Sequence, residues 1–199
     1  ADIVLIAVSD AAIGEVARGI GPRNGVVAHT SGASTYDLLL PHPHRGVLWP
    51  IQTLGGGDAL DLGGVPLAVD GATPQAVEVL ERLARDLSGY AIVLSEAERR
   101  TVHLAAVLTS NFPVFLVGQA QRLLQRRGLP HDLLGPLWQR TAANVMAVGP
   151  EAALTGPARR GDQATIQAHL ELLGDDTDLR AAYRLLTTMI MKAHGHPAP

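Results

Sequence analysis

Two kinds of hydrophobic pattern divide this chain near Leu94, and the division limits the fold more than any other feature of the sequence. Before it, short apolar runs rich in β-branched residues alternate with amphipathic stretches. The runs predict strands at residues 3–8, 25–29, 46–49, 65–69 and 91–94, and the amphipathic stretches predict helices at 11–20 and 74–87. Strands separated by helices pair in parallel through right-handed crossovers. We therefore expect an α/β domain over residues 1–94.

After Ser95 the strand pattern disappears. Ser95 is a good N-cap and is followed by an acidic first turn, which predicts a long helix to about residue 127, interrupted at Pro113. Further helices are expected at 131–148, 161–173 and 177–193. The chain is thus expected to continue as an all-helical C-terminal domain over residues 95–194, with a tail at 195–199.

Charge and composition narrow the class of protein. The net charge is −3, fifteen of the sixteen basic residues are Arg, and there is no Cys. A nucleic-acid or membrane partner, chemistry based on a lysine amine or a thiol, and a metal site are therefore not expected. The most apolar helical run, 104–117, is shorter than the ~20 residues that span a bilayer. We expect a soluble, cytoplasmic protein.

Small polar residues follow two of the predicted strands. Val8-Ser9-Asp10 follows the first strand, and His29-Thr30-Ser31-Gly32-Ala33 follows the second. In open α/β sheets ligands bind at the carboxyl ends of parallel strands. Ordinary capping of the following turns by Ser9, Asp10 or Ser31 explains the same pattern, and spacing alone leaves both interpretations open.

Two groups in the helical part are candidates for chemistry. His103 lies in an apolar helix with Ser110 and Asn111 two turns later, an arrangement suited to a proton donor beside an orienting amide, or to a hydrogen-bonded core histidine. Thr155, Arg159 and Arg160 lie between two predicted helices, where they could bind a carboxylate or a phosphate or simply form a turn. Asp162 is expected to cap the helix that follows.

These segments together resemble a known family. The run Ala1–Asp10, the segment His103–Asn111, Asn144, and Ala153-Leu-Thr-Gly-Pro157 through Arg160-Gly-Asp162 to Leu170 are similar to the bacterial Rossmann-like proteins that carry the C-terminal domain of unknown function 2520. That family belongs with the pyrroline-5-carboxylate reductases and the 6-phosphogluconate-dehydrogenase-like superfamily. The resemblance implies a partial Rossmann-type parallel sheet followed by a helical substrate and dimerisation domain.

The resemblance also implies a site and its ligands. The cofactor would be NADP or NAD, flanked by Ala7, Val8, Ser9 and Asp10, with Thr30, Ser31 and Gly32 near the nicotinamide ribose. His103, Ser110, Asn111, Thr155 and Arg160 would line the substrate side, His103 and Asn111 being catalytic. The partners would be a small-molecule substrate and a second copy of the chain, bound through the helical domain.

Two hypotheses about function follow. In the first, the protein is an NAD(P)-dependent oxidoreductase acting on a small carbonyl or imine substrate that carries a carboxylate. In the second, it is a non-catalytic binding or dimerisation module that has lost the cofactor phosphate loop, because the glycine fingerprint of such folds does not occur in this sequence. The first strand would lie at an open edge, so we expect upstream strands or a partner to cover it.

Overall fold

The computed structural model describes residues 2–53 and 61–197, which form two compact units, one ending at Val114 and the other beginning at Phe115. The sequence pattern had placed the division at residue 94, before the helix that starts at Glu96. The first unit contains β1 (Ile3–Ile6), η1 (Asp10–Ala12), α1 (Ile13–Gly19), β2 (Val26–His29), η2 (Tyr36–Leu39), β3 (Arg45–Pro50), β4 (Leu67–Gly71), α2 (Pro74–Ser88), β5 (Ala91–Val93), α3 (Glu96–Ala106) and η3 (Val107–Asn111).

The five strands form one sheet in the order β1-β2-β3-β4-β5. Parallel pairing is confirmed between β1 and β2, β2 and β3, and β4 and β5, but the expectation of a fully parallel sheet is wrong at β3 and β4, which are antiparallel. A parallel crossover needs a helix-length connection, and no helix lies in the described part of the link between these two strands. The glycine-rich residues Gly55–Gly57 of this link lie outside the described residues.

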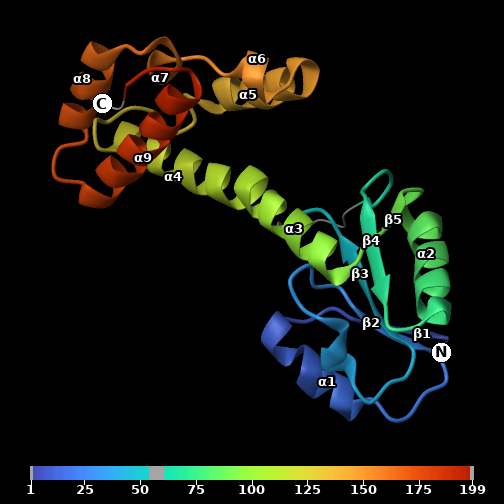
Figure 1. Cartoon of the computed structure of the whole chain (residues 1–199). Helices are drawn as coiled ribbons and strands as arrows, with labels where there is room; N and C mark the ends of the chain where they lie inside the picture. Colours follow the sequence, from blue (N-terminus) through green and yellow to red (C-terminus); the bar gives the residue numbers. More distant parts are fainter. Residues whose placement is uncertain (1, 54–60, 198–199) are drawn as a thin grey trace. The chain divides into compact units, whose positions relative to one another are not determined.

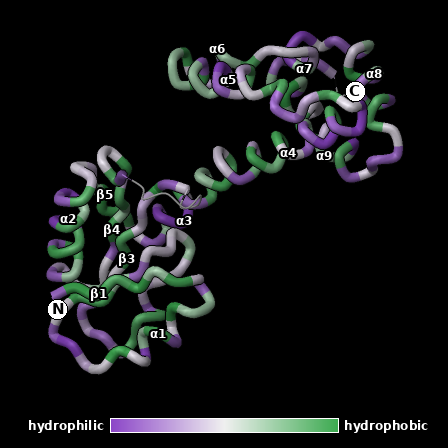
Figure 2. The backbone as a smooth tube through the Cα atoms, turned by 180° about the vertical axis from the view of Figure 1, so that it is seen from behind, coloured by the Kyte–Doolittle hydropathy of each residue, from purple (hydrophilic) through white to green (hydrophobic). Residues whose placement is uncertain are grey.

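Helical layers cover the sheet, with α2 on one face and α1 on the other (Figures 1 and 2). On one face, Val26, Ala28 and Leu48 pack against the apolar stripe of α2. On the other, Val27 and Ile6 pack against α1. A sheet covered on both faces needs strands that are apolar throughout, which explains the continuous hydrophobic runs in the sequence.

Local signals set the ends of α2 where the pattern predicts them. The Thr73 side chain caps the helix by accepting a hydrogen bond from the Ala76 N–H, and Pro74 occupies the first turn, where its missing N–H is not needed. Gly89 ends the helix at φ 74°, a left-handed conformation that favours glycine.

The second unit is helical, as expected. It holds most of α4 (Phe112–Gln125), then α5 (Gly135–Val148), α6 (Pro150–Ala153), α7 (Pro157–Arg160), α8 (Gln163–Leu172) and α9 (Thr177–Ala193). Its core contains Ala158, Ile166, Leu170 and Met191. The chain after α9 packs back onto α7, because the His196 ring donates from Nε2 to the Arg159 carbonyl at 3.0 Å.

The long helix that was expected to break at Pro113 instead continues through it. The turn before the proline is widened to a π turn, in which the Phe112 N–H donates to the carbonyl of Val107, five residues earlier. By length and composition alone, the combined helix Glu96–Gln125 is the one run in the described residues that could cross a bilayer, and it contains the fully buried Arg99. The length and apolar composition of one helix are weak evidence for a membrane segment.

The fold predicts how α2 responds to truncation of its apolar stripe. Leu80 is fully buried against the sheet, so Leu80→Ala is expected to lower the free energy of unfolding of the first unit by about 2–5 kcal/mol. Leu87, on the same helix, is 44% exposed, so Leu87→Ala should cost under about 1 kcal/mol. Chemical denaturation followed by Trp49 emission in a Trp138→Phe background measures both. Equal losses would contradict this packing.

Candidate active site

One row of residues crosses four strands on the same face of the sheet. Ile6 pairs with His29, His29 with Val47, and Val47 with Asp70. Because β1 and β2 run parallel, the segments that follow them leave the sheet at one edge. The structure therefore brings together, at the level of the backbone, the two segments predicted to bind the cofactor, Ala7–Asp10 and Thr30–Gly32.

The loop after β2 is held by its own side chains. The Ser31 N–H donates to His29 Nδ1 at 3.1 Å, so the ring proton lies on Nε2, which donates to the Thr35 carbonyl at 3.2 Å. The Ser31 hydroxyl accepts hydrogen bonds from the N–H groups of Ala33 and Ser34, at 3.2 and 3.1 Å. The prediction that Ser31 caps a turn is confirmed, and a role in binding a ligand remains a prediction.

Arg99 holds the same loop from the interior. It lies in the first turns of α3, its side chain is fully buried, and its Nη1 donates to the carbonyl oxygens of Gly32 at 2.8 Å and Ser31 at 3.4 Å. Its Nη2 lies 3.7 Å from Oδ2 of Asp70, on β4. A capping box of Ser95 and Glu98 fixes the start of α3 and so the position of Arg99.

Burial dominates the electrostatics of this ion pair. Loss of hydration lowers the pKa of Arg99, and the Asp70 and Glu96 carboxylates only oppose that shift. Loss of hydration likewise raises the pKa of Asp70, against hydrogen bonding from the Gly71 N–H and the charge of Arg99. At both partners desolvation outweighs the mutual attraction, as is typical of a buried pair that is incompletely hydrogen-bonded.

His103 lies one helical turn after Arg99, over the same loop. Its ring centroid is 5.6 Å from that of Trp49, with the two planes tilted by 52°. Gly32 fits beneath both rings, since a Cβ there would lie 2.5 Å from the Trp49 ring and 2.8 Å from His103 Cδ2. His103 is half-buried and has no hydrogen-bond partner among the described residues.

The residues after β1 are open to a ligand. Ala7, Val8, Ser9 and Asp10 are all exposed. Ser9 occupies the N-cap position of η1, yet its side chain makes no capping hydrogen bond, so the capping interpretation does not apply to it. Val8 is 42% exposed and offers a small apolar surface beside this free hydroxyl.

The remaining predicted site residues lie elsewhere. Ser110, half-buried, and Asn111, exposed, lie in the π turn at the end of the first unit. Thr155 and Arg160 belong to the second unit, where Arg160 is exposed and its Nη2 is 3.9 Å from Asp162 Oδ2. Asp162 caps α8, as expected. The roles of these four residues in binding or catalysis remain predictions.

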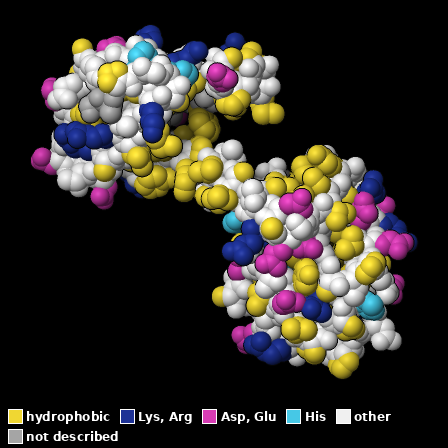
Figure 3. Space-filling view, in the orientation of Figure 1, with side chains coloured by type: hydrophobic (Ala, Val, Ile, Leu, Met, Phe, Trp, Pro, Cys, Tyr) yellow, Lys and Arg dark blue, Asp and Glu magenta, His cyan; other side chains and the backbone are white. Residues whose placement is uncertain are grey.

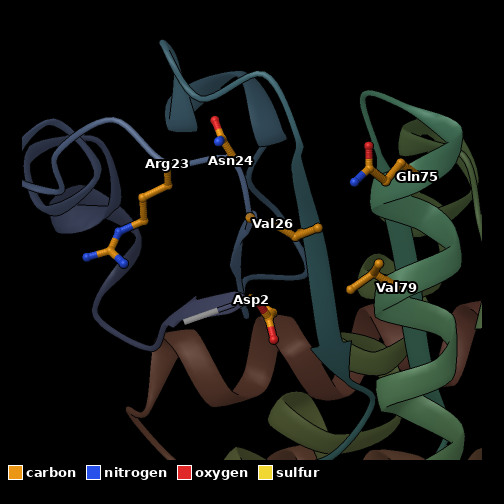
Figure 4. A pocket seen from close by; sticks show the side chains of 7 residues that line it. Asp2, Arg23, Asn24, Val26, Gln75 and Val79 are labelled. Atoms are coloured by element: carbon orange, nitrogen blue, oxygen red, sulfur yellow. The ribbon is translucent and has the colours of Figure 1, made fainter.

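The first unit also contains a cavity of about 420 Å³ at the amino ends of β1 and β2, away from the residues above. It is lined by Asp2, Arg23, Asn24, Gly25, Val26, Gln75 and Val79. Val26 and Val79 point toward one another there, while Arg23 extends away (Figure 4).

No group of three potential metal ligands occurs in the described residues. His42 is buried, and its ring donates to the Ala17 carbonyl at 3.0 Å.

Sequence reasoning missed Arg99, Asp70 and Trp49. The sequence did contain a signal for Arg99. Residues 99, 102, 103 and 106 recur at the helical period on one face of α3, and all four are buried or half-buried. An arginine on such a face needs a buried acceptor. Nothing local pointed to Asp70 or Trp49, whose contacts depend on strand order.

Fold and site together define a class. The sheet, the ligand-accessible edge and the helical second unit are those of a Rossmann-like α/β protein. A solved structure from Bacteroides fragilis, the "putative NADP oxidoreductase BF3122", is 32% identical, with a TM-score of 0.89 over 96% of this chain and 76% of that one. The protein TM1727 from Thermotoga maritima shares the fold at 24% identity and a TM-score of 0.82, over 98% of this chain and 79% of that one.

A more distant structure shares only the fold. The imine reductase from Myxococcus stipitatus, solved in complex with NADP+, is 17% identical, with a TM-score of 0.53 over 97% of this chain and 74% of that one. No match was found among proteins with curated descriptions. Residues 65–190 match the family described as domain of unknown function (DUF2520), and the chain belongs to that family.

The buried imidazole of His29 gives a testable pH dependence. Burial lowers its pKa below 6.5, so the unfolded chain takes up a proton as the pH falls through 6.5 while the folded chain does not. The ionisation of His29 therefore leaves the free energy of unfolding unchanged above pH 6.5. Below pH 6.5 it lowers the free energy of unfolding by at most about 1.4 kcal/mol per pH unit. Denaturation of the wild type and of His29→Asn between pH 5.5 and 7.5 measures the difference.

His131→Asn is the matched control, since His131 is an exposed histidine of the second unit. It should leave the pH profile of the first unit unchanged. If the stability difference between the wild type and His29→Asn did not change with pH, the assigned neutral state of His29 would be wrong.

Proposed function

We propose that this protein is an NAD(P)-dependent oxidoreductase that reduces a small carbonyl or imine substrate carrying a carboxylate. The observation that carries the proposal is the position of His103. It is a partly exposed imidazole with no hydrogen-bond partner among the described residues, and it packs on Trp49 and on Gly32 in the loop after β2. The similarity to the Bacteroides fragilis protein supports the same class of reaction.

The residues present fit the nicotinamide and ribose half of such a cofactor. Val8 offers an apolar surface, Ser9 offers a hydroxyl free of capping, and Thr30 and Ser31 are half-buried at the end of β2. When bound, the cofactor would supply a hydride to the substrate carbon. The glycine fingerprint that would bind the pyrophosphate does not occur in this sequence. The preference for NADP or NAD depends on the residues that meet the 2′ position of the adenosine ribose, at the other end of the cofactor.

The chain's own residues would supply the proton and the orientation. A protonated His103 would donate from a ring nitrogen to the oxygen or nitrogen of the substrate double bond as the hydride arrives at carbon. The Trp49 ring restrains the imidazole and shields one side of it from water. We assign orientation of the substrate to Asn111 and Ser110. Arg160 with Thr155, in the second unit, remains a predicted binding site for a carboxylate, because a guanidinium binds carboxylates with two parallel hydrogen bonds.

Replacement of His103 tests the chemical role. His103→Ala is expected to lower kcat by about 10²–10⁴-fold, because general acid catalysis contributes that much, while the Kd for NADPH changes less than about threefold. Stopped-flow NADPH oxidation with a panel of cyclic imines and keto acids gives kcat, and quenching of Trp emission gives Kd. His131→Ala, at an exposed histidine, is the control.

Two results would contradict the proposal in different ways. If His103→Ala turned over at the wild-type rate, His103 would not be the acid. Failure of the wild-type protein to bind NADPH or NADH would instead favour the second function, a non-catalytic module. The exposed apolar helices of the second unit are the observation in favour of that alternative.

We further propose that the protein is a cytoplasmic homodimer joined through the second unit. α5 buries none of its residues, and Leu137 and Val148, both 61% exposed, recur on one face of it. Figure 3 shows hydrophobic side chains gathered on the surface of this part of the chain. Exposed apolar surface of this extent marks an interaction site, and a second copy is the occupant that the proposed enzyme class supports.

A charge on that face should separate the copies. Leu137→Asp is expected to weaken dimerisation at least about 30-fold, since burying an unpaired carboxylate in an interface costs 2 kcal/mol or more. Sedimentation equilibrium measures the dissociation constant. Gln139→Asp adds the same charge at an exposed polar position of α5 and should leave it unchanged. A wild-type protein that sediments as a monomer would contradict the dimer.

A further inference from the structure

A cavity of about 330 Å³ lies within the second unit, where the end of α4 meets α8 and α9 (Figure 1). It is lined by Leu123, Arg127, His169, Leu172, Leu173 and Tyr183, and its surface is mostly apolar. The proposed oxidoreductase chemistry uses none of these residues. Because small-molecule sites begin at a volume of about 300 Å³, the cavity is large enough for a ligand of its own.

The three leucines of the lining do not belong to the core of the second unit. That core consists of Ala158, Ile166, Leu170 and Met191, all of them buried. Leu172, by contrast, is 68% exposed. Close-packed interiors leave few voids larger than a water molecule, and an apolar cavity offers water few hydrogen bonds. The cavity therefore suits the apolar part of a ligand.

Arg127 supplies a positive charge to the lining. It follows α4, is exposed, and has no ion pair or hydrogen bond among the residues that the structure describes. The neighbouring arginines are already engaged, since Arg126 lies 3.3 Å from a carboxylate oxygen of Asp176 and Arg180 donates to the Leu170 carbonyl. A guanidinium can bind a carboxylate with two parallel hydrogen bonds, so the charge of Arg127 favours an anionic group on the ligand.

His169 and Tyr183 add a hydrogen-bonded pair to the same lining. Nδ1 of His169 lies 2.8 Å from the Tyr183 hydroxyl, and the two rings meet edge to face at 78°. A neutral imidazole that accepts from this hydroxyl carries its proton on Nε2, and a charged imidazole carries protons on both nitrogens. Burial raises the pKa of Tyr183, so its hydroxyl stays protonated. None of the described lining residues is acidic, so nothing in the lining opposes a carboxylate.

We propose that this cavity binds a small monocarboxylate with an apolar aliphatic body, the leucines contacting the body and Arg127, beside His169, binding the carboxylate. At ~30 Å³ for each non-hydrogen atom, the share of a water molecule in the liquid, the cavity holds about ten such atoms. Octanoate is a ligand of that size. The inference goes beyond the proposed function and does not rest on it.

Isothermal titration calorimetry of the full-length protein with octanoate tests the site. We expect saturable binding at one site per chain. Arg127→Met should weaken it at least about tenfold, because hydrogen bonds to a charged group contribute that much. Leu172→Trp, at a position too exposed to disturb the core, should fill the cavity and weaken binding by a similar factor.

Matched controls separate this site from the apolar surface elsewhere on the chain. Arg122→Met removes an exposed arginine of α4 that does not line the cavity, so it should leave the affinity for octanoate within about twofold. Octanol, which has the same chain without the charge, should bind the wild type at least about tenfold more weakly than octanoate. Acetate, which lacks the chain, should not bind measurably.

Three results would overturn the inference. The first is a wild-type protein that does not bind octanoate. The second is equal binding to the wild type, Arg127→Met and Leu172→Trp, which would place the ligand on another surface. The third is a Leu172→Trp variant that binds octanoate normally but dissociates into monomers in sedimentation equilibrium, because the cavity would then belong to an interface between copies.

Weaker octanoate binding in Arg127→Met and Leu172→Trp, with Arg122→Met unchanged, supports the inference. The Kd for NADPH is measured on the same samples and should stay within about twofold in all three variants. Octanoate binding without NADPH binding would contradict the proposed function alone, and NADPH binding without octanoate binding would contradict this inference alone.

Discussion

The buried guanidinium of Arg99 is the interaction on which the arrangement of the first unit depends. It joins α3 to the loop after β2, 67 residues earlier in the chain, and to Asp70 on β4. An arginine deprived of water needs buried acceptors, and the Gly32 carbonyl accepts from Nη1 at 2.8 Å, whereas Nε and Nη2 have no hydrogen-bond partner among the described residues. The contact ties α3 to the loop, and His103, one turn later, lies against Trp49.

The fold was predictable where it depends on local pattern. The bounds of α9 were predicted at both ends, and α2 ends one residue after its predicted end, because caps, a first-turn proline and apolar periodicity act within a few residues. The direction of β4 was not predictable from its own residues, since a buried strand is equally apolar whether it pairs in parallel or antiparallel. It depended on the connection before it, whose glycines and lack of a helical pattern were the better guide.

Some residues of the candidate site could likewise be predicted from local pattern, and others could not. Ser31, Gly32 and His103 were predicted from strand ends and from a polar residue in an apolar helix, and they do lie close together. Arg99 and Trp49 were missed because each matters through a partner far away in sequence, and a sequence pattern contains no distances between segments. His29 belongs between the two cases, since its position at a strand end was visible but its neutral state follows from burial, which only the three-dimensional structure gives.

The π turn shows how one residue can place polar groups in an apolar helix. Pro113 has no N–H to donate, so the preceding turn widens, and the Thr109 hydroxyl donates back to the Ala105 carbonyl at 3.0 Å. The widened turn contains Ser110 and Asn111, with exposed apolar residues such as Leu108 and Phe112 beside them. Such turns occur often at functional sites. The turn interrupts the exposed apolar surface of the helix with two polar side chains, which supports the proposed enzyme over an interaction module.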